Sequence, residues 1–190
     1  MKTRFRRFVP LLFAAFFTLP APNQGVQVEN LKAEVLLKLL SQNRSIDFSA
    51  IDSVRLAIFY DQTDARSRGE AETYRRILVQ YQNPPFKGKA MSVSKHSEVR
   101  SDSLAWGNLQ AALIMPGGEA HLPEILKPCA DYRVLSMSTD TALVARGISV
   151  AVEIDAQRQP LICFNLSSLA KEGAVYDAEI LELARCMTWK

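Results

Sequence analysis

The feature that most constrains the fold is a nearly unbroken apolar run over residues 54–60, interrupted only by Arg55. A run of this length without alternating polar residues is typical of a strand covered on both faces, and such strands favour parallel sheets. A second apolar run, over residues 111–115, ends at the turn sequence Pro116-Gly117-Gly118. The two runs predict buried strands of an α/β domain.

Segments with helical periodicity alternate with these strands. Apolar residues recur at helical spacing over residues 28–40 and 65–81, with charged residues mostly on the opposite faces. The expected elements between and after them are a weak strand (87–94), a candidate helix (98–106), a short helix (119–126) and a strand (134–137). This order predicts a single-domain α/β fold, a wound mixed sheet flanked by helices with right-handed crossovers.

The last third of the chain predicts a β-hairpin followed by a helix. Apolar residues alternate with small or polar ones over residues 148–154, and a polar segment separates them from a second strand over 161–164. Asp177 is placed to cap a final helix. The apolar stripe of that helix consists of Ile180, Leu181, Ala184 and Met187. We therefore expect a C-terminal β-hairpin and a packed final helix, and we treat residues 22–190 as one domain.

The first 21 residues have the pattern of a secretory signal peptide. Four basic residues precede the first acidic one: Lys2, Arg4, Arg6 and Arg7. The apolar run that follows, over residues 8–19, is shorter than the roughly 20 residues that a membrane-spanning helix needs. We expect cleavage after Ala21 and a periplasmic location. An uncleaved membrane anchor is the alternative, and it also places the folded part outside the cytoplasm.

The positive charge of the chain belongs to this N-terminal segment. Without the four basic residues, the formal net charge of +3 becomes −1. Nucleic-acid binding requires a basic surface to meet the phosphates. We therefore expect no nucleic-acid partner.

No catalytic or metal-binding motif stands out in the sequence. His96 and His121 are the only histidines, and neither has the spacing of metal ligands, so each is interpreted as exposed to solvent. No nucleophile-elbow pattern is present to join a base and an orienting acid. We therefore expect a protein that is not an enzyme and that has no metal and no cofactor.

Two loops that follow strands are weak candidates for ligand binding. Asp61 leaves a buried strand at its carboxyl end, where open α/β sheets bind ligands. Gly117 and Gly118 lie between a strand and a helix, where backbone N–H groups can hold an anion. Ordinary turns are the alternative for both loops, because neither a Walker lysine nor a full dinucleotide fingerprint is present.

Three cysteines in an exported chain leave at least one unpaired within the chain. Cys163 in the last strand and Cys186 in the last helix are the first choice for a disulfide, if that helix returns over the sheet. Cys129 lies in an expected loop after Pro128, and it could instead pair with either of them, remain free or link two chains. Three reduced, buried thiols are the remaining alternative.

Several short patterns in the C-terminal third occur together. They are Gly147-Ile148-Ser149-Val150, Ile162-Cys163-Phe164-Asn165-Leu166, Ala170 with Gly173, and Ile180-Leu181-Glu182-Leu183-Ala184. With the order of the elements, they resemble the YfiR-like family of periplasmic proteins. The resemblance begins at the helical segment 31–37 and is strongest after Thr139. The chain departs from it at residues 43–48, where many relatives have an aromatic-Trp-Pro stretch.

The resemblance implies a regulatory binding protein in cyclic-di-GMP signalling. Family members of known role repress a membrane-bound diguanylate cyclase by binding its periplasmic sensor domain, until an outer-membrane partner sequesters the repressor. The family also implies homodimers and disulfide-dependent stability. The expected partners are therefore an inner-membrane sensor protein, an outer-membrane protein and a second copy of the chain.

Aromatic side chains are favoured anchors of such an interface. The candidates are Tyr60, Tyr81, Phe86 and Trp106. Core packing is the alternative for each of them. A small periplasmic ligand-binding protein is the alternative function, favoured by the wound α/β pattern and by the loops near Asp61 and Gly117.

Overall fold

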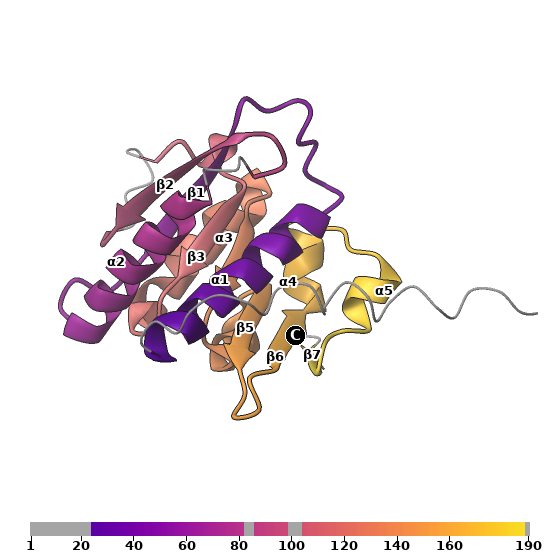
Figure 1. The fold of residues 1–190 in the computed structure, drawn as a ribbon. Coiled ribbons are helices and arrows are strands. Elements are labelled where there is room, and N and C mark those ends of the chain that lie inside the picture. The colour runs from indigo at the N-terminus through magenta and orange to yellow at the C-terminus, as the bar shows by residue number, and fades with distance from the viewer. Residues whose placement is uncertain (1–23, 82–85, 99–103, 189–190) are drawn as a thin grey trace, which may run out of the picture.

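The computed structural model describes residues 24–81, 86–98 and 104–188. Within them, the chain forms one seven-stranded sheet with helices on both faces (Figure 1). The expected signal peptide, residues 1–21, lies outside the described residues, as does most of the candidate helix at 98–106. The α/β fold class expected from the sequence is confirmed.

Helices and strands alternate along most of the chain. The helices are α1 (Gln24–Gln42), α2 (Ala65–Gln80), α3 (Leu122–Tyr132), α4 (Leu166–Lys171) and α5 (Ala178–Leu181). The strands are β1 (Ser53–Phe59), β2 (Ala90–His96), β3 (Ala111–Ile114), β4 (Leu135–Ser138), β5 (Val150–Ile154), β6 (Pro160–Asn165) and β7 (Cys186–Thr188). Short 3₁₀ helices lie at η2 (Trp106–Asn108), η3 (Gly118–His121) and η4 (Thr141–Arg146).

The sheet has the strand order β2-β1-β3-β4-β5-β6-β7. Strands β1 to β5 are parallel, β6 runs antiparallel to β5 in the expected hairpin, and β7 runs parallel to β6. The apolar run at residues 54–60 forms β1, which lies between β2 and β3 and is buried from Leu56 to Phe59. A strand that is covered on both faces needs this unbroken apolar sequence.

Two hydrophobic cores lie on opposite faces of the sheet. Ile58 of β1 packs in one core with Tyr74 of α2, and the next residue, Phe59, packs in the other core with Ile125 of α3. Figure 1 shows α1 and α2 in front of the strands and α3 behind them. The alternation of side chains along β1 therefore supplies both cores from one short sequence.

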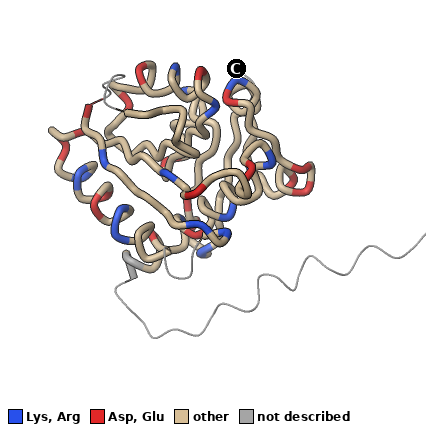
Figure 2. Tube along the Cα trace, turned by 90° about the horizontal axis from the view of Figure 1, so that it is seen from above, with Lys and Arg blue, Asp and Glu red and all other residues tan. Residues whose placement is uncertain are grey.

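The charged residues of the described part form local contacts on its surface. Figure 2 shows acidic and basic residues interspersed around the fold. Ion pairs one helical turn apart join Arg66 to Glu70 at 2.8 Å and Lys127 to Asp131 at 2.5 Å. Such pairs contribute only a few tenths of a kcal/mol, about 0.3–0.5 each. Among the described residues, no helix is long and apolar enough to cross a membrane.

The expected final helix is much shorter than its apolar stripe suggested. Helix α5 ends at Leu181, and the expectation that Cys186 and Met187 lie in it is wrong, because both lie in β7. Strand β6 is buried along most of its length, so the backbone groups on its outer edge need hydrogen-bond partners. Residues 186–188 supply them by pairing with residues 163–165.

Cys129 lies in α3 rather than in the expected loop, where it is buried and free. Helix α3 continues through Pro128 to Tyr132, although a proline inside a helix removes one hydrogen bond. The stripe of Leu122, Ile125 and Cys129 is buried against the sheet. The stabilisation from this packing outweighs the hydrogen bond lost at Pro128. Because Cys129 is buried, it is not placed on the surface to form a disulfide with a second chain.

The expected disulfide between Cys163 and Cys186 is present and joins β6 to β7. The two cysteines are register partners across these strands, with their Cα atoms 4.7 Å apart. Closing a loop with a sequence separation of 23 residues stabilises a fold by about 3 kcal/mol in the chain-entropy model. The disulfide thus fixes the last described strand to the sheet.

Asn43 fixes the end of α1 to the C-terminal part of the domain. Its buried side-chain oxygen accepts hydrogen bonds from the backbone N–H of Ser45 at 3.1 Å and of Val175 at 3.0 Å. The N–H of Arg44 donates to the carbonyl of Val175 at 2.8 Å. The segment in which the sequence departs from the YfiR-like pattern therefore begins with a structural contact.

A buried carboxyl group, that of Glu172, connects the end of α4 to the middle of the sheet. Its oxygens accept hydrogen bonds from the N–H and the hydroxyl of Ser136, at 2.9 and 2.6 Å, and from the hydroxyl of Ser149 at 2.5 Å. Glu172 is 4% exposed. Burial raises its pKa from 4.5 to about 7, against the lowering effect of these hydrogen bonds.

The raised pKa predicts how Glu172 makes stability depend on pH. The carboxyl group of Glu172 loses its proton near pH 4.5 in the unfolded chain, whereas it keeps the proton up to about pH 7 in the folded chain. The free energy of unfolding should therefore fall by about 3 kcal/mol as the pH rises through this window. The variant Glu172→Gln, which is neutral throughout, should lose this slope in urea unfolding of the oxidised protein. Equal slopes for both proteins would contradict the prediction.

Candidate functional site

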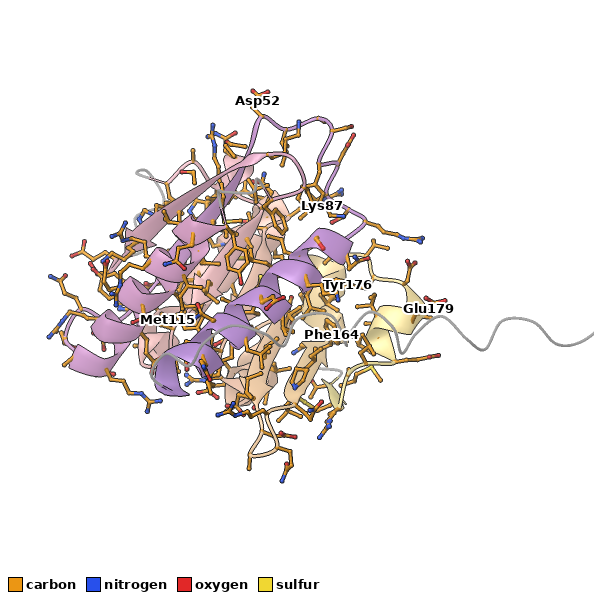
Figure 3. All side chains as sticks on the ribbon, viewed as in Figure 1. Asp52, Lys87, Met115, Phe164, Tyr176 and Glu179 are labelled. Carbon is orange, nitrogen blue, oxygen red and sulfur yellow. A yellow bond between two sulfur atoms is a disulfide. The ribbon has the colours of Figure 1, made fainter. Side chains whose placement is uncertain are left out.

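The sheet reverses its winding direction at β1. The chain leaves β1 for β2 on one side of it and then crosses to β3 on the other side. In open parallel sheets, the loops on the two sides of such a switch point diverge and leave a crevice at the carboxyl ends of the strands. Figure 3 marks this edge by Met115, which follows β3, while Asp52 before β1 lies at the opposite edge. The candidate site lies at the Met115 edge.

A shallow pocket lies at this switch point. It has an empty volume of about 180 Å³, part of which is open to solvent. Its lining residues come from the ends of β1 and β2 and from the turns and helix that follow β3. They are Phe59, Tyr60, His96, Ser97, Gly118, His121 and Ile125. Gly118 is the one weak ligand-binding candidate of the sequence that lines the pocket directly.

Backbone hydrogen bonds hold the three strand ends together at the pocket. The N–H of Tyr60 donates to the carbonyl of His96 at 3.1 Å, and the N–H of Met115 donates to the carbonyl of Phe59 at 2.9 Å. The register of the parallel strands places Phe59 opposite His96 on one side and opposite Ile114 on the other. The pocket walls are therefore continuous with the sheet.

The loops on either side of the switch point are fixed by their own turns. Asp61 accepts hydrogen bonds at Oδ1 from the N–H and the hydroxyl of Thr63, both at 2.7 Å, and its own N–H donates to Ser67 at 3.0 Å. The hydrogen bonds from Thr63 lower the pKa of Asp61, so it is ionised at neutral pH. This loop therefore places a fixed negative charge next to the pocket.

Gly117 is required by two features of its surroundings. Its φ of +90° lies in the left-handed region, and a Cβ atom at this position would lie 2.8 Å from Oδ2 of Asp64. Asp64 caps α2 by accepting the N–H of Arg66 at 2.8 Å, so it cannot move away without loss of the cap. The close approach of the two loops depends on this glycine.

An aromatic stack supports one wall of the pocket. The ring of Phe59 stacks on Trp106 with centroids 5.5 Å apart, and the ring of His96 lies 5.6 Å from Phe59. Trp106 is only 3% exposed, so it is a core residue and offers no surface to a partner. Its role at the site is to hold Phe59 in place.

His96 and His121 both line this pocket, although they lie 25 positions apart in the sequence and belong to no recognisable motif. Nε2 of His96 lies 2.8 Å from the hydroxyl of Ser94, and Nδ1 of His121 lies 3.2 Å from a carboxylate oxygen of Glu124. Burial lowers the pKa of His96, which favours its neutral form at pH 7. His96 is half-buried rather than exposed as the sequence suggested, whereas the side chain of His121 is 40% exposed. Within the described residues, no three potential ligands are arranged to hold a metal ion.

The other aromatic candidates for partner binding do not gather at this site. Tyr60 is half-buried and lines the pocket. Tyr81 and Phe86 lie after α2 and before β2, at the opposite edge of the sheet, and both pack partly against the core. Phe86 meets Phe48 edge to face at 5.9 Å. The four candidates therefore do not form one surface.

The sequence matches no protein-family profile and no curated protein. Several solved structures share its fold. A conserved domain protein from Vibrio cholerae has a TM-score of 0.59 at 10% identity, over 82% of this chain and 60% of that one. The ABC domain from Streptococcus pneumoniae in complex with L-Trp has a TM-score of 0.57 at 12% identity, over 83% of this chain and 60% of that one.

A third similar structure is the ligand-free, open form of a substrate-binding protein with adhesive properties from Clostridium difficile. Its TM-score is 0.58 at 11% identity, over 84% of this chain and 59% of that one. The chain thus spans about 60% of the length of these proteins. At such low identity the likeness shows a shared α/β fold, and two of the three proteins that share it are described as bound to or binding a substrate or ligand.

The turn at Gly117 predicts a large difference between two glycine variants. Gly117→Ala should lower the free energy of unfolding by about 1–3 kcal/mol, because of the positive φ and the contact with Asp64. Gly69 is the matched control: it lies in α2 with open space around it. Gly69→Ala should raise the free energy by up to about 1 kcal/mol. Urea unfolding measures both, and equal effects would contradict this view of the turn.

Proposed function

We propose that the protein binds a small ligand at the pocket over the β1–β3 switch point. The observation that carries this proposal is the convergence of His96, His121 and Tyr60 in one pocket, from three segments that are far apart in the sequence. Binding sites in open α/β sheets occur at such switch points, and they combine apolar walls with a few convergent polar groups. The apolar residues Phe59 and Ile125 also line the pocket, although both are almost fully buried.

The similar structures support a binding function at the level of the fold. One of them holds L-Trp and another is described as a substrate-binding protein. The signal-peptide pattern of residues 1–21 supports binding outside the cytoplasm, in the periplasm. Ligand binding thus takes precedence over the regulatory function that the sequence resemblance implies.

A ligand screen of residues 22–190 tests the proposed function. Thermal unfolding would be followed with single amino acids including L-Trp, small amines, carboxylates, sugars and nucleotides. A ligand at about 100 times its Kd should add about 2.7 kcal/mol to the free energy of unfolding and raise Tm. The variant His121→Ala should abolish the shift, because His121 lines the pocket.

Tyr132→Ala is the control for this screen, since Tyr132 is 56% exposed at the far end of α3 from His121. It should keep the ligand-induced shift. If no compound raises Tm, or if the shift survives in His121→Ala, the pocket is not the binding site.

A regulatory function is the second candidate, and exposed apolar side chains in the C-terminal part of the domain favour it. Several large apolar side chains are about half exposed in the C-terminal part of the domain, where the resemblance to the YfiR-like family is strongest. They are Val175 (52%), Leu183 (47%) and Met187 (51%). Exposed apolar side chains of this kind are candidates for a protein interface. The partner would be the periplasmic domain of an inner-membrane diguanylate cyclase, with release by an outer-membrane protein.

A pull-down from solubilised membranes tests this second candidate. The wild-type protein should retain an inner-membrane protein with a cyclase domain, and the double variant Leu183→Glu/Met187→Glu should lose it. Charged residues would have to be desolvated in an apolar interface, at a cost of several kcal/mol, about 2–5. Tyr132→Glu, which adds one negative charge at another exposed site, should retain the partner. Retention by all three proteins would exclude this surface.

A further inference from the structure

The two imidazoles of the pocket are both held by groups outside it. The carboxylate of Glu124 can only accept a hydrogen bond, so Nδ1 of His121, 3.2 Å away, carries the hydrogen. In the neutral ring, Nε2 is then a hydrogen-bond acceptor with a free lone pair. A carboxylate that fixes a histidine tautomer in this way is a common support for a ring that binds through its other nitrogen.

The same reasoning applies to His96. The hydroxyl of Ser94 lies 3.5 Å from the carbonyl oxygen of Leu56, to which it can donate its hydrogen. The hydroxyl oxygen then accepts from Nε2 of His96 at 2.8 Å, so Nε2 carries the hydrogen and Nδ1 is the acceptor. Both histidines of the chain therefore line one pocket with an unprotonated ring nitrogen available.

The charges around the pocket favour a positive ligand group. None of the residues that line the pocket is a lysine, an arginine or a carboxylate. The basic side chains around the pocket have partners of their own. Lys95 pairs with Glu72 at 2.5 Å and also lies over the ring of Tyr60, 5.9 Å from its centroid. Arg68 donates to the carbonyl of Gln62, and Arg146 donates to the carbonyl of Glu119 at 3.4 Å. Asp61 contributes a fixed negative charge close to His121.

The start of α3 does not reverse this preference. The positive end of a helix dipole attracts anions, but η3 and the first turn of α3 carry Glu119 and Glu124. These carboxylates offset the dipole at the pocket. A ligand carboxylate or phosphate would therefore meet two hydrogen-bond acceptors and several negative charges.

We propose that the pocket binds the ammonium group of a small amine, with Nδ1 of His96 and Nε2 of His121 as hydrogen-bond acceptors. This inference rests on the proposed ligand-binding function and specifies the chemical class of the ligand. A primary ammonium group can donate three hydrogen bonds and is attracted by the carboxylate of Asp61.

Three probes that differ only in their polar end test this inference: 2-phenylethylamine, 2-phenylethanol and phenylacetate. Binding to residues 22–190 would be measured by calorimetry above the usual titration range of histidine. The amine should bind more tightly than either other probe, by about tenfold or more, because only it forms charge-assisted hydrogen bonds with both ring nitrogens. Equal or tighter binding of phenylacetate would overturn the proposal, as would failure of the amine to bind.

Variants of the two histidines separate the role of the ring nitrogens from the contribution of the apolar part of the probe. His121→Leu and His96→Leu should each weaken the amine by about tenfold and leave 2-phenylethanol nearly unchanged. The nitrogen-15 shifts of the imidazoles in the wild-type protein should move at the acceptor nitrogens when the amine is added. Tyr132→Ala is the control, and Tm of each variant verifies folding. Amine binding that is insensitive to both histidine variants would overturn the proposal.

Failure of the amine assignment can be distinguished from failure of the proposed ligand-binding function. If another compound of the broader screen raises Tm and His121→Ala abolishes that shift, the pocket is a ligand site and only the amine assignment is wrong. If no compound raises Tm, both the proposed function and this inference fail.

Discussion

The rest of the structure depends on the burial of β1 on both faces. Ile58 and Phe59 point into different cores, so one strand joins the layer of α1 and α2 to the layer of α3. The chain then places β2 and β3 on opposite sides of this strand. The switch point, and with it the pocket, follows from the position of β1 between β2 and β3, because the loops that leave β1 and β3 at the same edge must diverge.

The sequence predicted the central part of this fold and its hairpin well. Unbroken apolar runs and helical periodicity are strong local signals, which is why β1, α2, β3 and the β5–β6 hairpin lie where they were expected. The expected elements at the C-terminus and around Cys129 were wrong for non-local reasons. Strand β7 exists because the edge of β6 needs partners, and α3 passes Pro128 because three of its side chains pack on the sheet.

The site was predicted only in part, for a similar reason. The position of Asp61, Gly117 and Gly118 after buried strands indicated the edge of the sheet at which the candidate pocket lies. No local pattern could indicate the histidines, since His96 reaches the pocket through its register with Phe59 and His121 through the turn before α3. The tautomers inferred for both rings also depend on neighbours, Ser94 and Glu124, that have meaning only once the fold is known.

The position of β2 in the sheet has a consequence for how the pocket behaves. Within the described residues, β2 is an edge strand that pairs only with β1, and most of its side chains are exposed or half-buried. Such a strand opens locally at a lower free energy than the interior of the sheet, and its amide hydrogens exchange faster. Because β2 carries His96, the opening of this strand would remove one wall of the pocket, together with the contribution of Met91 to the core that contains Tyr74. If a ligand binds at the pocket as proposed, its occupancy and the order of this edge are thermodynamically linked, and the bound molecule would slow amide exchange along β2.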